Sequence, residues 1–277
     1  MKDIQNKLIL ITGGSSGIGR IMAFAFAEKK ARVIIWDVNS EAVKAAEDEA
    51  QGKNLFIKGM ICDVSNPGDV CAQAKKLTED FGHLDILINN AGVVSHKGSD
   101  SIPGPLFLSV PDERIRKTIE INTLSLFWTC KAFLPSMIER NSGHIVTISS
   151  SAGIIGVKGL SDYSASKFAA FGFDESLRME FKRMKSAIKT TVVCPFFIDT
   201  GMFHGVKTRF PLLLPILKSE YAAKKIVAAV LKNKQQLFMP CFVRSVFFLR
   251  ILPVQVLDFA ANITGISHAM DDFKGRT

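Results

Sequence analysis

The fold of this chain is decided by the stretch Leu8-Ile9-Leu10-Ile11-Thr12-Gly13-Gly14-Ser15-Ser16-Gly17-Ile18-Gly19. It joins a short apolar run, residues 8–12, to a glycine-rich turn, and a helical pattern follows over about residues 18–29. Short β-branched apolar runs are typical of buried parallel strands. A strand that passes through a glycine turn directly into a helix is the setting in which backbone amides and a helix N-terminus bind a dinucleotide pyrophosphate.

Three glycines in this turn have the spacing that such binding requires. We expect Gly13 and Gly17 to let the backbone turn tightly and approach the phosphates, and Gly19 to let the helix pack against the strand. The other residues of the turn that we assign to the cofactor site are Ser15, Ser16 and Ile18. A glycine-rich turn without a ligand is the alternative, and the position directly after the first strand disfavours it.

The next predicted strand, residues 32–36, ends in Asp37. A carboxylate at this position can accept hydrogen bonds from both hydroxyls of an adenosine ribose, and it would repel a 2′-phosphate. We therefore expect NAD(H) to be preferred. NADP(H) stays open because Arg20 could bind that phosphate. Asp37 could instead be a turn or capping carboxylate, but Asn39 and Ser40 are better placed to cap the following helix.

Alternating strand and helix patterns continue to residue 239. Further strands are predicted over 55–61, 84–88, 143–148, 189–194 and 236–239, and helices over 41–51, 69–81, 112–140, 164–185 and 219–232. Parallel strands joined by crossover helices form a sheet that carries helices on both faces. The sequence thus predicts an α/β fold of the Rossmann type, doubly wound, with a mostly parallel sheet of seven strands.

Small and polar residues follow the predicted strands, where open parallel sheets bind their ligands. Asp63 is placed to read an adenine amino group, with the amide of Val64 beside it. The other strand-end residues that we assign to the cofactor are Asn90, Ala91, Gly92, Pro195, Ile198 and Thr200.

Tyr163 and Lys167 are four residues apart in a predicted helix, so their side chains lie on one face. A phenol has a reference pKa of about 10, and a neighbouring ammonium lowers that pKa. Such a pair can exchange a proton with an alcohol or a ketone near neutral pH. The pair alone is weak evidence, because a tyrosine above a lysine is common on helix surfaces.

Five motifs, in this order, resemble the short-chain dehydrogenase/reductase family. They are Thr12-Gly13-x-x-x-Gly17-x-Gly19, Asn89-Asn90-Ala91-Gly92, Asn122, Ser150 and Tyr163-x-x-x-Lys167, and the resemblance covers about residues 7–239. It implies that Tyr163 is the acid/base on the substrate oxygen. It also implies that Lys167 lowers the pKa of Tyr163 and holds the hydroxyls of the nicotinamide ribose.

The same resemblance implies roles for two more residues. Ser150 lies thirteen residues before the tyrosine, as in the family, and would hydrogen-bond the substrate oxygen and stabilise developing charge. Ser149 and Ser151 are expected to turn toward backbone or solvent. Asn122 would hold a water in a proton relay behind Lys167, or bond a neighbouring carbonyl, or do both.

One departure from the family pattern follows the sixth predicted strand. The family commonly has Pro-Gly there, and this chain has Pro195-Phe196. The departure concerns the local backbone. The amide of Ile198 and the hydroxyl of Thr200 remain available to hold the nicotinamide carboxamide.

Several phrases resemble one branch of the family, the retinol dehydrogenases and the hydroxysteroid dehydrogenases of lipid droplets. These phrases are 143–147, 166–173, 200–203 and 273–277. The expected activity is an NAD(H)-dependent interconversion of an alcohol and its ketone or aldehyde, on a lipophilic retinoid, sterol or fatty derivative. The alternatives are a 3-oxoacyl-carrier-protein reductase, whose usual preference for NADPH conflicts with Asp37, and a catalytically silent nucleotide-binding scaffold on the same fold.

The predicted organisation is one Rossmann-fold domain, residues 1–240, and an apolar, helical extension, residues 241–277. A lid over the nicotinamide is expected at about residues 198–218, and a core helix interrupted by prolines is the alternative. The apolar segment 242–259 contains two arginines, an aspartate and a proline, so it is too broken to span a bilayer. We expect it to pack on the core or on a dimer partner, or to lie on a membrane surface.

Composition narrows the remaining classes. The net charge is +9, but the basic residues are scattered, so we expect no nucleic-acid partner. Five cysteines without C-x-x-C spacing and five dispersed histidines indicate reduced thiols and no metal site. The polar start of the chain does not resemble a secretory signal. We expect a cytoplasmic, not secreted, protein with some contact with membranes, and a homodimer or homotetramer formed through the helices that carry Asn122 and Tyr163.

Overall fold

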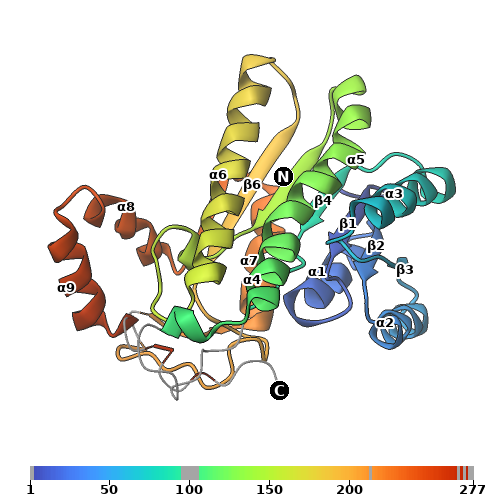
Figure 1. The fold of residues 1–277 in the computed structure, drawn as a ribbon. Helices are drawn as coiled ribbons and strands as arrows, with labels where there is room; N and C mark the ends of the chain where they lie inside the picture. Colours follow the sequence, from blue (N-terminus) through green and yellow to red (C-terminus); the bar gives the residue numbers. More distant parts are fainter. Residues whose placement is uncertain (1–2, 95–105, 212–213, 267–268, 271–272, 274–277) are drawn as a thin grey trace.

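The computed structural model of the protein describes residues 3–94, 106–211, 214–266, 269–270 and 273. Its centre is a parallel sheet of seven strands in the order β3-β2-β1-β4-β5-β6-β9 (Figure 1). These strands are β1 (Leu8–Thr12), β2 (Arg32–Asp37), β3 (Ile57–Ile61), β4 (Ile86–Asn89), β5 (His144–Ile148), β6 (Lys189–Pro195) and β9 (Gln236–Met239). The predicted fold class, a Rossmann-type α/β protein with seven parallel strands, is confirmed.

Helices cover both faces of the sheet. The α-helices of the described residues are α1 (Gly17–Ala27), α2 (Ser40–Gly52), α3 (Pro67–Phe81), α4 (Asp112–Ile119), α5 (Ser125–Glu139), α6 (Ser161–Arg183), α7 (Ser219–Leu231), α8 (Val246–Leu249) and α9 (Val254–Thr264), of which α8 and α9 do not cover the sheet. One apolar cluster joins α1, α2 and α7 to the sheet, and another joins α3, α5 and α6 to it. Because the sheet is covered on both sides, its central strands are apolar at nearly every position, and β1 is buried throughout.

The strand order places the functional edge of the sheet. β1 pairs in parallel with β2 on one side and with β4 on the other, so the chain reverses its direction of winding between these neighbours. In open parallel sheets, ligands bind in the crevice outside the carboxyl ends of the strands at such a reversal.

The helix that the sequence predicts over 112–140 is not continuous. A π-helical segment, η2 (Glu120–Leu124), separates α4 from α5. A π turn contains an extra residue and is frequent at functional sites. The apolar pattern on either side of η2 does not reveal it, because the segment is held by contacts with distant parts of the chain, as described below.

A second, two-stranded sheet was not predicted. β7 (Ile198–Asp199) and β8 (Leu217–Lys218) pair in parallel, and each is too short for a strand pattern to show in the sequence. The pairing brings together the two ends of residues 200–216, here called the β7–β8 loop. Residues 212 and 213, in the apolar run of the expected lid, lie outside the described residues.

The segment after β9 forms the short helices η4 (Cys241–Ser245) and α8, and then α9. Val243 and Val246 are buried in an apolar cluster with Phe171 and Phe196, so this part packs on the core as one of the expectations had it. None of the residues of α9 is buried, and α8 and α9 lie at the margin of the molecule, away from the sheet (Figure 1). Within the described parts of the chain, no helix has the length and apolar character needed to cross a bilayer.

Candidate active site

The glycine turn between β1 and α1 has the conformation that its sequence requires. Gly13 and Gly17 have φ values of +62° and +52°, a region that favours glycine. A Cβ at Gly19 would collide with the carbonyl oxygen of Gly13, so α1 can approach the turn only with glycine there. Gly13 and Gly17 therefore supply the positive φ angles of this turn, and Gly19 lets α1 lie close to it.

Asn90, directly after β4, holds this turn in place through hydrogen bonds. Its Nδ2 donates to the carbonyl oxygens of Thr12 at 2.9 Å and Gly13 at 3.1 Å. In return, Thr12 Oγ1 accepts hydrogen bonds from the backbone amides of Asn90 and Ala91, both at 3.0 Å. The side-chain amide of Asn90 is thus occupied in holding the turn, which fixes two strand ends relative to each other.

Asp37 connects the end of β2 to the same turn. Its Oδ2 accepts hydrogen bonds from the Ser15 amide at 3.2 Å and the Ser15 hydroxyl at 2.6 Å. The following helix is capped by Asn39, whose side chain accepts from the amide of Ala42 at 2.9 Å, as predicted. Arg20 points to a different partner: it is ion-paired with Glu49, and it does not line the cavity described next.

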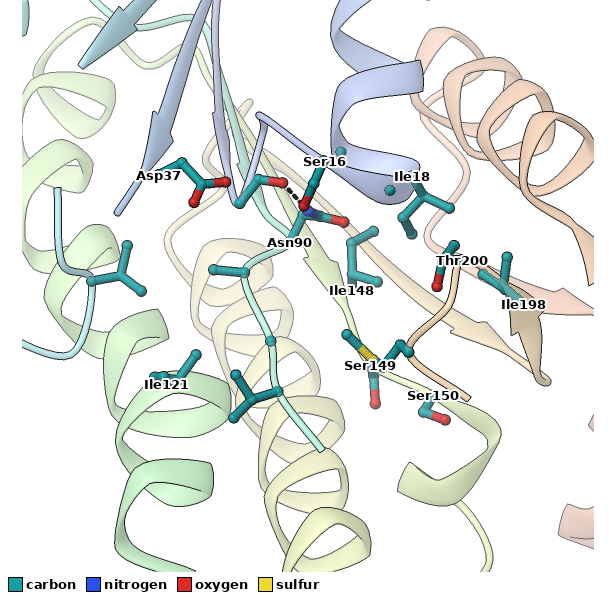
Figure 2. A pocket seen from close by; sticks show the side chains of 18 of the residues that line it. Ser16, Ile18, Asp37, Asn90, Ile121, Ile148, Ser149, Ser150, Ile198 and Thr200 are labelled. Atoms are coloured by element: carbon teal, nitrogen blue, oxygen red, sulfur yellow. Dashed lines mark hydrogen bonds between the residues drawn. The ribbon is translucent and has the colours of Figure 1, made fainter. Parts of the chain in front are cut away.

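A cavity of about 260 Å³ runs along the carboxyl ends of the strands; it is called here the larger cavity. Asp37 lies toward one end of it and Ser150 toward the other (Figure 2), so the cavity is elongated. The residues with predicted roles that line it are Gly13, Ser16, Gly17, Ile18, Gly19, Asp37, Asp63, Val64, Asn90, Ala91, Gly92, Ser150, Tyr163, Lys167, Pro195, Ile198 and Thr200.

Two residues with predicted roles, Ser15 and Asn122, are buried but do not line the larger cavity. Other lining residues were not predicted: Trp36, Val38, Cys62, Val93, Ile121, Ile148, Ser149, Phe196, Met202 and Phe203. Several of these residues lie one position from the end of a strand, so the sequence could have indicated them. Ile121, Met202 and Phe203 reach the cavity through tertiary packing, for which the sequence held no signal.

Tyr163 and Lys167 lie in the first two turns of α6, and both are buried. Lys167 Nζ is 5.7 Å from the centroid of the Tyr163 ring and donates to the carbonyl oxygen of Ile148 at 3.0 Å. Ser150, at the start of the short helix η3 (Ser151–Gly153), accepts from the Ala152 amide at 3.1 Å. Ser149 donates to the Lys167 carbonyl at 2.8 Å, so its hydroxyl turns to the backbone as expected.

Asn122, which lies on η2, makes three side-chain hydrogen bonds to other segments. Its Oδ1 accepts from the Val93 amide, and its Nδ2 donates to the Val93 carbonyl, both at 2.8 Å. Nδ2 also donates to the Ser166 hydroxyl at 3.0 Å. These bonds tie the π turn to the chain after β4 and to the helix that carries Tyr163 and Lys167. The bond from Nδ2 to the Val93 carbonyl is the carbonyl contact expected for Asn122.

Burial controls the ionisation of the Tyr163 and Lys167 pair. It raises the pKa of Tyr163 to about 12, and a hydrogen bond with Ser150 opposes this shift. It lowers the pKa of Lys167 to about 8, because removal from water disfavours the charged ammonium. The direction for Tyr163 is opposite to the one expected from the sequence, where a neighbouring ammonium was expected to lower the pKa. The protein's own residues therefore favour a neutral phenol.

A second, apolar cavity of about 40 Å³ adjoins the catalytic side chains; it is called here the apolar cavity. It is lined by Ser150, Ser151, Ala152, Ile155, Val157, Leu160, Tyr163, Phe196, Phe197, Phe203, Leu214, Phe242, Val243, Val246 and Ile266. These residues come from η3 and the segment after it, the start of α6, the chain after β6, the β7–β8 loop, η4, α8 and the chain after α9. Ser150 and Tyr163 thus stand between an elongated cavity at the strand ends and a cavity walled by hydrocarbon.

Known proteins share this arrangement. Residues 7–209 match the model of the short chain dehydrogenase family. The chain is 44% identical over 275 residues to short-chain dehydrogenase/reductase family 16C member 6 of Bos taurus, covering 98% of this chain and 84% of the relative. It is also 44% identical over 278 residues to epidermal retinol dehydrogenase 2 of Mus musculus, covering 99% of this chain and 87% of the relative.

Among solved structures, the fold is similar to that of a short chain dehydrogenase/reductase from Burkholderia phymatum in complex with NAD. The TM-score is 0.80 at 24% identity, with 93% of this chain and 97% of that chain covered. Fold, site and relatives agree on the class: a nicotinamide-dinucleotide oxidoreductase that acts on alcohols and carbonyl compounds. The chain belongs to the short-chain dehydrogenase/reductase family, as its motifs indicated.

Proposed function

We propose that this enzyme interconverts a lipophilic alcohol of the retinoid type and its carbonyl compound, with NAD(H) as the preferred cofactor. The observation that carries the proposal is the position of Ser150 and Tyr163, which line both the larger cavity and the apolar cavity. One relative of the chain, epidermal retinol dehydrogenase 2, supports the substrate class by its name. The test is NAD⁺ reduction with all-trans-retinol, set against a fatty alcohol, a sterol and short secondary alcohols.

The residues of the larger cavity fit a dinucleotide. The glycine turn and the N-terminus of α1 offer backbone amides to a pyrophosphate, and Asp63 with the Val64 amide faces the place for an adenine. Asp37 supports the preference for NAD(H), because its carboxylate is one of the cavity walls and would repel a 2′-phosphate. The pairing of Arg20 with Glu49 supports the same preference, because it engages the cation that could bind such a phosphate.

In the proposed reaction, Tyr163 exchanges the proton of the substrate oxygen and Ser150 hydrogen-bonds that oxygen. A bound nicotinamide supplies the hydride acceptor or donor and, when oxidised, adds a positive charge to the site. This charge favours the phenolate of Tyr163 and opposes the effect of burial described above. Lys167, fixed by the Ile148 carbonyl, holds the ribose hydroxyls, and Asn122 positions the helix that carries both residues.

The other two functions remain less well supported. A 3-oxoacyl-carrier-protein reductase would need neither the apolar cavity nor Asp37, and the relatives do not favour it. A silent scaffold would need no acid/base, yet Ser150, Tyr163 and Lys167 are buried together at the cavity. Cofactor binding without turnover of any alcohol in the panel would support the scaffold.

We further propose that residues 198–218 act as the lid of a domain formed by residues 1–240. β7 and β8 close the base of this segment, and Met202 and Phe203 from its loop reach the larger cavity. The exposed apolar residues Phe127, Ile138 and Met179 on α5 and α6 support a homodimer or homotetramer formed through these helices, which size-exclusion chromatography with light scattering would test.

Contact with a membrane surface is the second partner that we propose, through the extension 241–277. Phe248, Ile251 and Phe259 are 71%, 80% and 66% exposed. Phe248 lies on α8, whose Val246 lines the apolar cavity, Ile251 lies in the turn after α8, and Phe259 lies on α9. A lipophilic substrate dissolves in the bilayer, so an apolar surface beside the substrate cavity fits a lipid partner. Arg250 donates to the Ile154 carbonyl at 2.8 Å and ties this segment to the rest of the molecule.

A further inference from the structure

Two aromatic residues without a role in the proposed chemistry share the boundary between the two cavities. Four residues line both cavities: Ser150, Tyr163, Phe196 and Phe203. The first two are the proposed catalytic pair. Phe196 and Phe203 complete the boundary, so any group that reaches Tyr163 from the apolar cavity must pass these two rings.

Phe196 is fixed to the central sheet. Its amide donates to the Met239 carbonyl at 2.7 Å, which continues the pairing of β6 with β9 beyond the last strand residue. Its ring lies 4.7 Å from the ring of Phe197, and the Phe197 carbonyl accepts from the Leu217 amide at 2.8 Å. The backbone that carries Phe196 therefore has no freedom to withdraw, and a ring occupies the position where the family commonly has glycine.

Phe203, on the β7–β8 loop, also lines the boundary between the two cavities. Its ring lies 5.8 Å from the Tyr163 ring at an interplanar angle of 82° and 5.2 Å from the Phe197 ring at 71°. Edge-to-face pairs at such distances stabilise by about 0.5–1.5 kcal/mol each. The position of Phe203 is thus set by the catalytic tyrosine on one side and by the fixed Phe197 on the other.

We propose that Phe196 and Phe203 form an aromatic aperture that makes the enzyme selective for primary carbinols at the end of a flat, extended chain. A terminal CH₂OH or CHO group has substituents on one side only and can enter between two rings. A secondary carbinol within a fused ring system carries carbon on both sides, so one side would overlap with Phe196 or Phe203. The apolar cavity is small, about 40 Å³, so it suits a narrow chain better than a fused ring system. This inference rests on the proposed function.

The experiment compares kcat/KM for all-trans-retinol with kcat/KM for a fused-ring sterol alcohol, using NAD⁺, in the wild type and in Phe196→Gly, Phe203→Ala and the double variant. Since a hydrophobic pocket discriminates by about 10- to 200-fold per small group, we expect each single variant to shift the ratio at least about tenfold toward the sterol. Phe210→Ala is the matched control: this ring lies on the same loop but is exposed and lines neither cavity. Its ratio should stay within about twofold of the wild type.

The outcomes separate the aperture from the function. A wild type that oxidises retinol, with a ratio that neither Phe196→Gly nor Phe203→Ala changes, overturns the aperture and leaves the function standing. A wild type that oxidises neither alcohol overturns the proposed function itself. If thermal melting shows that Phe203→Ala is unfolded, Phe203→Leu keeps the apolar volume without the ring, and it should give a smaller shift in the same direction.

Discussion

The two sides of the active site are held in different ways. On the side of the glycine turn, hydrogen bonds from fixed strand ends determine every position: Asn90 to the carbonyls of Thr12 and Gly13, and Asp37 to Ser15. On the apolar side, the walls come from separate segments and meet through aromatic contacts such as those of Phe203. Hydrogen bonds demand one geometry, whereas apolar walls tolerate changes of shape at moderate cost. The cofactor side therefore fixes the chemistry, and the apolar side is where the substrate is chosen.

The largest effect should come from the residue that serves both sides. Tyr163→Phe removes the acid/base, which contributes about 10²- to 10⁴-fold, so kcat should fall by that factor while NADH binding, followed by fluorescence, stays unchanged. Tyr221→Phe is the matched control, because it is the other tyrosine of the chain and is half exposed. A Tyr163→Phe enzyme with a near-normal rate would refute the acid/base role.

The next effect concerns Asp174, on the buried face of α6 about two turns beyond Lys167. Burial raises the pKa of this carboxyl to about 7, and the nearby hydroxyls of Thr190 and Thr147 oppose the shift. Between about pH 4 and pH 7 the folded protein keeps a proton that the unfolded chain releases, so the free energy of unfolding falls as pH rises through this window. Asp174→Asn should abolish this fall, which amounts to at most about 4 kcal/mol.

The measurement for Asp174 is urea unfolding from pH 4 to pH 8, with the difference between variant and wild type as the readout. Asp258→Asn, on the exposed α9, is the control and should follow the wild type. Parallel curves for wild type and Asp174→Asn would show that the carboxyl is not protonated in the folded protein.

A smaller effect is expected from Asp37→Asn, which tests whether a charge on the cofactor side sets the preference between NAD⁺ and NADP⁺. The amide keeps the shape and one acceptor for Ser15 but removes the charge that opposes a 2′-phosphate. The ratio of kcat/KM for NADP⁺ to that for NAD⁺ should rise by about 10- to 100-fold, or about 1.4 to 2.8 kcal/mol. Asp63→Asn should change both cofactors alike. A wild-type preference for NADP⁺ would contradict the proposal before any variant is made.

The smallest effect on stability belongs to the surface of the extension. Ile251→Ser and Phe259→Ser replace exposed side chains, so the free energy of unfolding should change by less than about 0.5 kcal/mol. Binding to vesicles of phosphatidylcholine with phosphatidylserine should weaken about tenfold for each. Ile61→Ser, exposed at the end of β3, is the control. Unchanged sedimentation with vesicles, together with a loss of oligomer, would identify this surface as a subunit contact instead.

Much of the lining of the larger cavity could be predicted, because its signals are local. Gly13, Gly17 and Gly19 are dictated by the backbone of one turn, and Asp37 by its place directly after a strand. Asn90 shows the limit of such prediction: it lines the larger cavity, and nothing in the sequence indicated that its side-chain amide is bonded to the turn. Ser15 is likewise bonded to Asp37 behind the cavity wall. Which way a polar side chain turns depends on neighbours that are distant in sequence.

By itself, the sequence determined the strand and helix alternation, the parallel sheet and the family, because hydrophobic period, glycine spacing and the Tyr163–Lys167 interval are short-range patterns. The tertiary structure decided the π turn at Asn122, the pairing of β7 with β8 and the position of Phe196 and Phe203 between the two cavities. It also decided the ionisation of Tyr163, whose pKa is raised to about 12. Burial is a property of the packed molecule as a whole, so the interval of four residues that places an ammonium near a phenol does not show how little water reaches either group.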